Sequence, residues 1–349
     1  MRVIVFDLEW NQGTFTNGHK RIEGFTAEII EIGAVRLDDS MKPVDSFHAY
    51  VKPQIFLTIH QVTDKLLHID TKELNEAEPF VQVFQRFLAW CGTEDYRFGT
   101  WGIMDLSILQ KNIAYYQMES LSDGPIPFLD VQKLFGYSQN TPKLRSTLEY
   151  AVDTLALAKE IPFHRALDDA TYTAKVLQQI ATPQLMQYIS YNVFHPPIDR
   201  SREIRIAFDT YTKYISRPFP DKPTALSDKE VASSRCPLCH RNLRKKVKWF
   251  TVNGFFYNCL AYCEIHGYLK GKVRMYKWNG PGIYVVKTTR FVTQEEADAM
   301  FLRKQLAAEH RSRRNARKRL RDSLKKSEPP QNGGEDPVET AQTTLSNDS

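Results

Sequence analysis

Residues 2–10 read RVIVFDLEW, a run of β-branched and aromatic residues short enough to form one buried strand. Side chains alternate along a strand, so Asp7 and Glu9 leave the backbone on the same face. Two neighbouring carboxylates repel each other unless a positive charge lies between them. The stretch therefore predicts a buried strand that presents a pair of carboxylates to a cation.

A second acidic stretch, HRALDD, occupies residues 164–169 and opens a segment, residues 166–180, in which apolar residues recur at helical spacing. His164 and Asp169 lie about a turn and a half apart on such a helix, which is close enough to serve one site. The alternative is that Asp168 and Asp169 are only first-turn acids that the helix dipole favours.

A further acid, Asp105, lies between these two stretches in the segment WGIMDL at residues 101–106. Hard divalent cations prefer carboxylate oxygens, and two such cations about 3.5 to 4 Å apart stabilise the attacking and leaving oxygens of an in-line displacement. The combined set predicts cleavage of a nucleic-acid backbone. Its members are Asp7, Glu9, Asp105, His164 and Asp169.

Three motifs carry a resemblance to a known family: D-x-E at Asp7 and Glu9, WGxxD ending at Asp105, and HxAxxD at residues 164–169. In this order they resemble the DnaQ-like 3′ to 5′ exonucleases of the His-bearing (DEDDh) branch. The middle motif is most similar to that of the histone-mRNA and sporulation-inhibitor-like exonucleases. The resemblance covers about residues 1–183. It implies a metal-dependent 3′ to 5′ exonuclease that acts on single-stranded or frayed ends, with RNA favoured over DNA.

The same resemblance implies a ribonuclease H-like α/β fold, a mixed five-stranded sheet flanked by helices. The apolar patterns agree with it in outline. They predict strands over residues 2–10, 27–37, 44–51 and 96–101. They predict helices near residues 77–91, 103–117, 146–159 and 165–181.

Roles for the acidic residues follow from the family likeness. Two Mg²⁺ or Mn²⁺ ions would be held by Asp7, Glu9, Asp105 and Asp169. His164 would take a proton from the attacking water, a task that suits histidine because its ordinary pKa lies near working pH. Spacing favours Asp169 over its neighbour Asp168 as the ligand.

Three further residues near the motifs receive lesser roles. Trp10 and Asn11 directly follow the first acidic pair and are expected to face the terminal nucleotide of the substrate. Asp130 resembles a recurrent acid of the family and is interpreted as structural. The alternative is that it supports one of the metal ligands.

Four of the five cysteines lie in the second half of the chain. Two residues separate Cys236 from Cys239, and two separate Cys263 from His266. Such pairs, about twenty residues apart, are typical of a zinc ribbon, because four ligands on two turns close a tetrahedral site. We expect these four residues to hold one structural Zn²⁺. Sets in which Cys259 replaces His266 or Cys263 stay open, as does simple packing of the thiols.

Charge is unevenly distributed along this chain of net charge +6. Residues 235–326 contain 23 Lys and Arg but 6 Asp and Glu, whereas residues 1–234 carry a net charge of −6. Aromatic residues such as Trp249 and Tyr276 interleave with the cations. Cations bind phosphates and flat rings stack on unpaired bases, so the second half is predicted to bind single-stranded nucleic acid. The alternatives are a solvated basic surface and a small aromatic core.

Composition divides the chain into five predicted parts. They are an exonuclease domain (1–183), a helical linker (184–234), a zinc-ribbon-like nucleic-acid-binding module (235–290), a basic helix (291–326) and a disordered polar tail (327–349). No run of eighteen apolar residues occurs, so no contact with a membrane is expected, and the chain is interpreted as soluble and cytoplasmic. Its oligomeric state is not indicated.

Two functions from other classes compete with the exonuclease. One is a nucleic-acid-binding protein whose nuclease fold has lost activity, which is disfavoured because all five catalytic residue types are present. The other is an RNA-assembly factor that uses the zinc module and the basic arm, with cleavage incidental.

Overall fold

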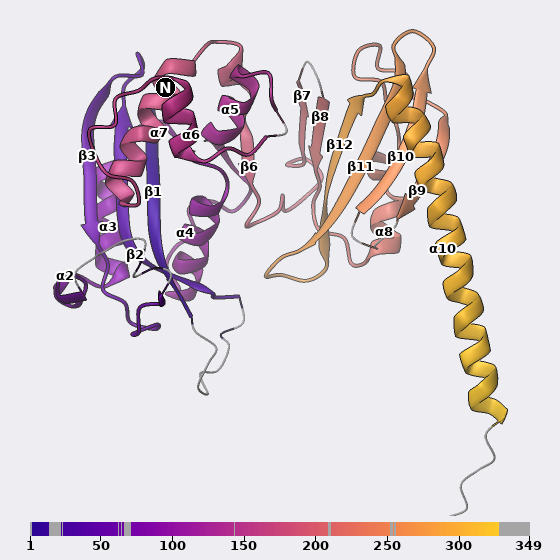
Figure 1. Ribbon diagram of the computed structural model, residues 1–349, viewed down its shortest axis with the longest axis horizontal. Coiled ribbons are helices and arrows are strands. Elements are labelled where there is room, and N and C mark those ends of the chain that lie inside the picture. Colours follow the sequence, from indigo (N-terminus) through magenta and orange to yellow (C-terminus); the bar gives the residue numbers. More distant parts are fainter. Residues whose placement is uncertain are drawn as a thin grey trace, which may run out of the picture.

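The computed structural model describes residues 2–13, 22, 24–61, 63, 65, 71–142, 144–208, 211–251, 254 and 256–327. These residues form two six-stranded sheets, side by side in Figure 1, and a long C-terminal helix. Apart from Ser327, the tail predicted at 327–349 lies outside the described residues. Within the described part, no helix is both long and apolar enough to cross a membrane.

The first sheet is mixed, with the strand order β3-β2-β1-β4-β5-β6. Its strands are β1 (Arg2–Gln12), β2 (Ala27–Leu37), β3 (Pro43–Tyr50), β4 (Tyr96–Thr100), β5 (Ile126–Asp130) and β6 (Ser190–Asn192). The pairs β1–β4 and β4–β5 are parallel, and the other pairs are antiparallel. The predicted mixed α/β fold is confirmed, with one strand more than the five expected.

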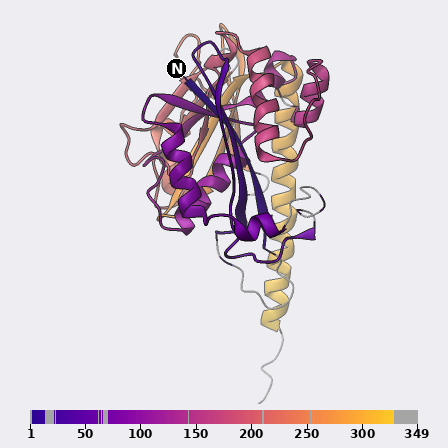
Figure 2. The same ribbon diagram turned by 90° about the vertical axis from the view of Figure 1, so that its left-hand side faces the viewer.

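Helices flank both faces of this sheet (Figure 2). They are α2 (Thr71–Glu76), α3 (Phe80–Cys91), α4 (Met104–Tyr115), α5 (Val131–Ser138), α6 (Leu148–Thr154) and α7 (Ala166–Ile180). Alternate residues of β1 enter different cores: Ile4 and Phe6 pack with α3 and α4, whereas Val3 and Val5 pack with α5, α6 and α7. The alternation continues along the strand and directs Asp7 and Glu9 toward the α7 side.

A glycine in β2 allows the start of α7 to approach the sheet closely. A Cβ atom at Gly33 would lie 2.1 Å from backbone atoms of both Ala166 and Leu167. Gly33 is also the direct antiparallel partner of Asp7. The close approach therefore brings the first turn of α7 next to the acidic pair of β1.

The second sheet is antiparallel, with the order β7-β8-β12-β11-β10-β9. Its strands are β7 (Ile204–Ala207), β8 (Tyr211–Ile215), β9 (Lys245–Thr251), β10 (Phe256–Cys263), β11 (Gly267–Lys277) and β12 (Ile283–Phe291). Its helices are α8 (Lys222–Ser227), α9 (Lys229–Ala232) and α10 (Gln294–Ser327). α10 is the basic helix that the sequence predicts.

The prediction of a helical linker over residues 184–234 is wrong. Among the described residues of this range (184–208 and 211–234), a short 3-10 turn (Leu185–Gln187) and the small helices α8 and α9 are helical, and β6, β7 and β8 are strands. β6 completes the first sheet, and β7 and β8 belong to the second. These strands have three to five residues and pair with distant segments, so their conformation comes from tertiary pairing more than from local pattern.

Candidate active site

β1 and α7 bring together three of the predicted carboxylates. One oxygen each of Asp7, Glu9 and Asp169 lies within 4.8 Å of the other two. Asp7 and Glu9 come from the α7-facing side of β1, and Asp169 comes from the first turn of α7. Two stretches far apart in the sequence thus converge at one point of the sheet surface.

Asp105 lies beside this group rather than within it. It occupies the first turn of α4 and is 5% exposed. Its Oδ1 accepts a hydrogen bond of 3.3 Å from the backbone N–H of Leu8, the residue between Asp7 and Glu9. The backbone of β1 therefore fixes the fourth carboxylate at the edge of the acidic group.

His164 lies two residues before the start of α7 and has a left-handed conformation, with φ of 69°. Its backbone N–H donates to Asp169 Oδ1 at 3.4 Å, and the residue is exposed. A non-glycine residue in this region of φ is uncommon and marks a constrained turn. The turn therefore holds the backbone of His164 against Asp169 and leaves the residue exposed.

The four carboxylates repel one another when they are charged. Burial, followed by the charge of Asp105, raises the pKa of Asp7 well above its ordinary value. Burial and Asp169 raise the pKa of Glu9 to about 8, and burial raises that of Asp105 to about 7 and that of Asp169 to about 6. Carboxylate oxygens this close to one another are suited to bind hard divalent cations, because the positive charge of the cation offsets their mutual repulsion.

These pKa shifts predict a pH dependence of stability for the metal-free protein. Folded Glu9 keeps its proton up to about pH 8, whereas the unfolded chain releases it near pH 4.5, so unfolding releases a proton in this interval. The melting temperature should therefore fall as pH rises from about 5 to about 8. Thermal unfolding at a series of pH values, without divalent ions, measures this.

Glu9→Gln is the matched variant, because it keeps the shape and removes the charge. Its melting temperature at pH 8 should exceed that of the unaltered protein by at least about 2 to 4 °C, the shift that 1 kcal/mol produces in a domain of this size. Added Mg²⁺ should stabilise the unaltered protein and have less effect on Glu9→Gln. A melting temperature that rises over this pH range would contradict the expectation.

A buried ion network beside the carboxylates was not predicted. Glu31 of β2 pairs directly opposite Glu9 and is fully buried. Its carboxylate binds Arg165 Nε at 3.3 Å and His48 Nε2 at 2.8 Å, and Arg165 also donates to the Tyr50 hydroxyl. The sequence contained one indication of this network, because Glu31 is an acidic residue within the otherwise mostly apolar run EIIEIGAV at residues 28–35.

Asn11 was expected to face the terminal nucleotide of the substrate, but its side chain is turned into the protein. It is fully buried, and its amide donates to the carbonyl oxygens of Phe56 and Thr58 at 2.8 and 3.0 Å, while its Oδ1 accepts from His60 N at 2.9 Å. Trp10 is partly buried and packs on the α3 and α4 core. Asn11 therefore holds the 56–60 loop in place.

Asp130 caps α5. Its Oδ1 accepts a hydrogen bond of 2.9 Å from the backbone N–H of Lys133, and Arg145 lies 4.0 Å from its Oδ2. Capping satisfies a backbone donor at the start of the helix. The structural interpretation of this acid is therefore confirmed.

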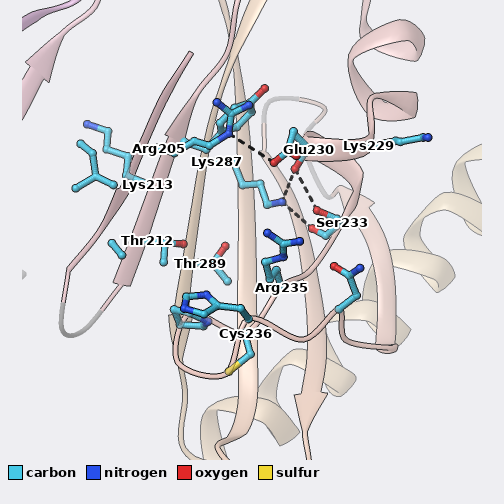
Figure 3. Close-up of a pocket in the computed structure, with 16 residues that line it drawn as sticks. Arg205, Thr212, Lys213, Lys229, Glu230, Ser233, Arg235, Cys236, Lys287 and Thr289 are labelled. Atoms are coloured by element: carbon cyan, nitrogen blue, oxygen red, sulfur yellow. Dashed lines mark hydrogen bonds and ion pairs between the residues drawn. The ribbon is translucent and has the colours of Figure 1, made fainter. Parts of the chain in front are cut away.

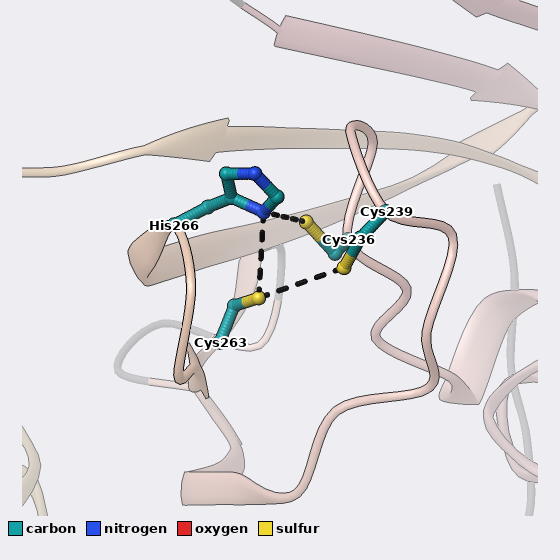
Figure 4. A group of neighbouring side chains, drawn as sticks. All are labelled: Cys236, Cys239, Cys263 and His266. Carbon is teal, nitrogen blue, oxygen red and sulfur yellow. Dashed lines mark hydrogen bonds between the residues drawn. The ribbon is translucent and has the colours of Figure 1, made fainter.

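The second half of the chain contains a four-ligand cluster at one end of its sheet (Figure 4). The ligand atoms of Cys236, Cys239, Cys263 and His266 all lie within 4.8 Å of one another. Cys239 Sγ is 3.7 Å from Cys263 Sγ, and His266 Nδ1 is 3.4 Å from Cys236 Sγ and 3.6 Å from Cys263 Sγ.

These separations fit a tetrahedral zinc site. With Zn–S near 2.3 Å and Zn–N near 2.0 Å, ligand atoms lie about 3.8 Å (sulfur to sulfur) and about 3.5 Å (sulfur to nitrogen) apart. Burial opposes ionisation of Cys263, but the backbone N–H groups of His266 and Ile265 prevail and lower its pKa to about 6. Cys259 is outside the cluster and contacts the Ser234 hydroxyl at 3.6 Å.

Comparisons with known proteins identify a family for the first half of the chain. The exonuclease family (RNase_T) matches residues 4–177. Residues 4–177, which contain the first sheet up to β5 and its carboxylates, are thus an exonuclease domain of this family.

Relatives include the probable 3′-5′ exonuclease KapD of Bacillus subtilis, which is 25% identical over 187 residues, or 51% of this chain and 83% of KapD. The 3′-5′ exoribonuclease 1 of Rattus norvegicus is 22% identical over 162 residues, or 44% of this chain and 46% of that protein. Among solved structures, the nuclease domain of 3′hExo bound to rAMP is 21% identical over 55% of this chain and 96% of its own, with a TM-score of 0.45.

Proposed function

We propose that this chain is a divalent-metal-dependent 3′ to 5′ exonuclease that shortens single-stranded nucleic acid and favours RNA over DNA. The observation that carries this proposal is the convergence of Asp7, Glu9 and Asp169 within 4.8 Å, with Asp105 beside them. The 3′ to 5′ direction agrees with the names of KapD and of the rat relative, and the name of the latter also gives RNA as its substrate.

Asp7, Glu9, Asp105 and Asp169 would hold two Mg²⁺ or Mn²⁺ ions. When bound, such ions lower the pKa of water and neutralise charge on the scissile phosphate. The exposed imidazole of His164 would accept the proton of the attacking water, since it stands in solvent beside Asp169. Arg165, fixed by Glu31 and Tyr50, lowers the pKa of Glu9 and so favours its charged form.

The second sheet offers a surface suited to a single strand. Lys272 and Arg274 of β11 are exposed, and their cationic groups lie 4.5 and 4.8 Å from the ring centre of Phe256 in β10. Such pairs of cations and rings bind phosphates and unpaired bases without reading sequence. We further propose that Cys236, Cys239, Cys263 and His266 hold one structural Zn²⁺ that orders this half of the chain.

Degradation of end-labelled single strands tests the proposal. RNA and DNA of one sequence, labelled at the 5′ end, should give ladders that shorten from the 3′ end with Mg²⁺ or Mn²⁺, faster for RNA. Protein dialysed free of Mg²⁺ and Mn²⁺ but supplied with Zn²⁺ should be inactive, which separates the two kinds of metal site. Internal cuts, release from the 5′ end, or faster loss of DNA would contradict the corresponding part of the proposal.

A further inference from the structure

A cavity of about 380 Å³ lies in the second half of the chain and shares no lining residue with the carboxylate site (Figure 3). It is formed between strands β7, β8 and β12 on one side and the segment from α9 to Asn242 on the other. Its volume is within the range of small-molecule binding sites. Neither the catalytic role nor the zinc cluster requires an open cavity at this place.

Sheet register explains which side chains face the cavity. Arg205 of β7 is the direct partner of Tyr214 in β8, and Thr212 is the direct partner of Thr289 in β12. Lys287 precedes Thr289 by two residues and so shares its face of the sheet. One face of three neighbouring strands therefore forms the wall of the cavity.

Positive charge dominates this wall. Four cationic residues line the cavity: Arg205, Lys229, Arg235 and Lys287. Lys213 lies between Thr212 and Tyr214 in β8, so its side chain leaves from the other face of the sheet (Figure 3). The acid among the lining residues, Glu230, lies 3.8 Å from the Arg205 guanidinium. Because positive charges outnumber negative ones in its lining, the cavity favours an anionic ligand.

The cations differ in how firmly they are held. Lys287 is 9% exposed, and its ammonium group donates to the carbonyl oxygens of Glu230 and Ser233, both at 2.6 Å. Lys229 and Arg235 are exposed, and their side chains form no hydrogen bond or ion pair with the part of the chain that the structure describes. Figure 3 shows Lys229 pointing away from the other lining residues. The cavity thus combines one fixed charge, that of Lys287, with one that is available to a ligand, that of Arg235.

We propose that this cavity binds a phosphate group of the single-stranded substrate at a distance from the 3′ end that is being cleaved. The proposal rests on the proposed function, because it supposes a nucleic-acid substrate. The lining contains no Phe or Trp, and the ring of its tyrosine, Tyr214, lies under the Arg205 guanidinium at 5.2 Å. Recognition at this site is therefore by charge and independent of base sequence.

Salt dependence of binding provides the test. The full-length, zinc-loaded chain carrying Asp169→Asn binds a fluorescent oligonucleotide of about 20 residues without degrading it. Adding Arg235→Gln should weaken binding about fivefold and reduce the slope of log K against log salt by about 0.7, the value for one lost contact to a single strand. Fluorescence anisotropy over a series of salt concentrations measures both quantities.

Lys222→Gln is the matched control, because Lys222 is exposed, lies in the same half of the chain and does not line the cavity. It removes the same charge and should change neither quantity. Equal zinc content and equal circular dichroism show that both variants are folded. If Arg235→Gln and Lys222→Gln have the same affinity and slope, the proposal is overturned.

Competition distinguishes a strand from a free phosphate compound. Inorganic phosphate and 5′-adenosine monophosphate should displace the oligonucleotide only weakly if the ligand is a strand. If the monophosphate binds as tightly as the oligonucleotide, and Arg235→Gln abolishes its binding, the cavity is a mononucleotide site and the strand assignment fails. Binding is measured without cleavage, so an inactive enzyme would contradict the proposed function and leave this test intact.

Discussion

Asp169→Asn should lower the rate of 3′-terminal nucleotide release by at least about 10³-fold, which corresponds to about 4 kcal/mol of lost transition-state stabilisation. The amide has the shape of the carboxylate but lacks its charge, and it stands where Asp7 and Glu9 lie within 4.8 Å. The loss should appear in the chemical step, with little change in RNA affinity. Single-turnover cleavage of labelled RNA at saturating enzyme separates the two quantities.

Asp168→Asn is the control, because it makes the same chemical change one residue earlier on α7. Asp168 lies outside the group of three carboxylates. The activity of the Asp168→Asn variant should stay within about threefold of that of the unaltered protein, because the substituted residue is not one of the expected metal ligands. Equal losses in the two variants would mean that the first turn of α7 acts through its total charge, and an active Asp169→Asn would remove this residue from the mechanism.

Cys263→Ser should abolish zinc binding and destabilise the second sheet. Structural zinc contributes an apparent free energy of about 10 kcal/mol or more, and Cys263 is in contact with both Cys239 and His266. We expect one Zn per unaltered chain after exhaustive dialysis, and close to none in the variant. Elemental analysis measures the loss of metal, and thermal unfolding measures the resulting loss of stability.

Cys259→Ala is the corresponding control. Cys259 is equally buried, but it contacts the Ser234 hydroxyl and not the cluster. The variant should keep one Zn per chain, although some loss of packing is expected from the smaller side chain. An unaltered protein that is folded with no zinc would reject the metal site, and loss of zinc in Cys259→Ala would favour the alternative ligand set.

The sequence was most informative where short motifs determine the structure locally. The run at residues 2–10 forms a central strand, β1, and the helix predicted near residues 165–181 is α7 (Ala166–Ile180). The preferred cysteine and histidine set also comes together. In each case strand alternation, helical spacing or ligand spacing is a property of a few neighbouring residues.

The features that the sequence did not predict depend on distant partners. Asn11 resembled a substrate contact because it follows the acidic pair, but the folded chain brings the 56–60 loop against its amide. Glu31 becomes part of the site only because Arg165, more than a hundred residues later, approaches it. Such contacts form in the tertiary structure and leave no periodic pattern in the sequence.

Strand β6 determines where the catalytic half of the chain can be truncated to give a stable fragment. It covers the outer edge of β5, and its Asn192 binds the side chains of Gln110 and Ser107 in α4 at 2.7 and 2.8 Å. A truncation at residue 183, the end of the exonuclease domain predicted from the sequence, would leave an open strand edge and an unsatisfied buried amide. A soluble catalytic fragment should therefore extend at least through Asn192.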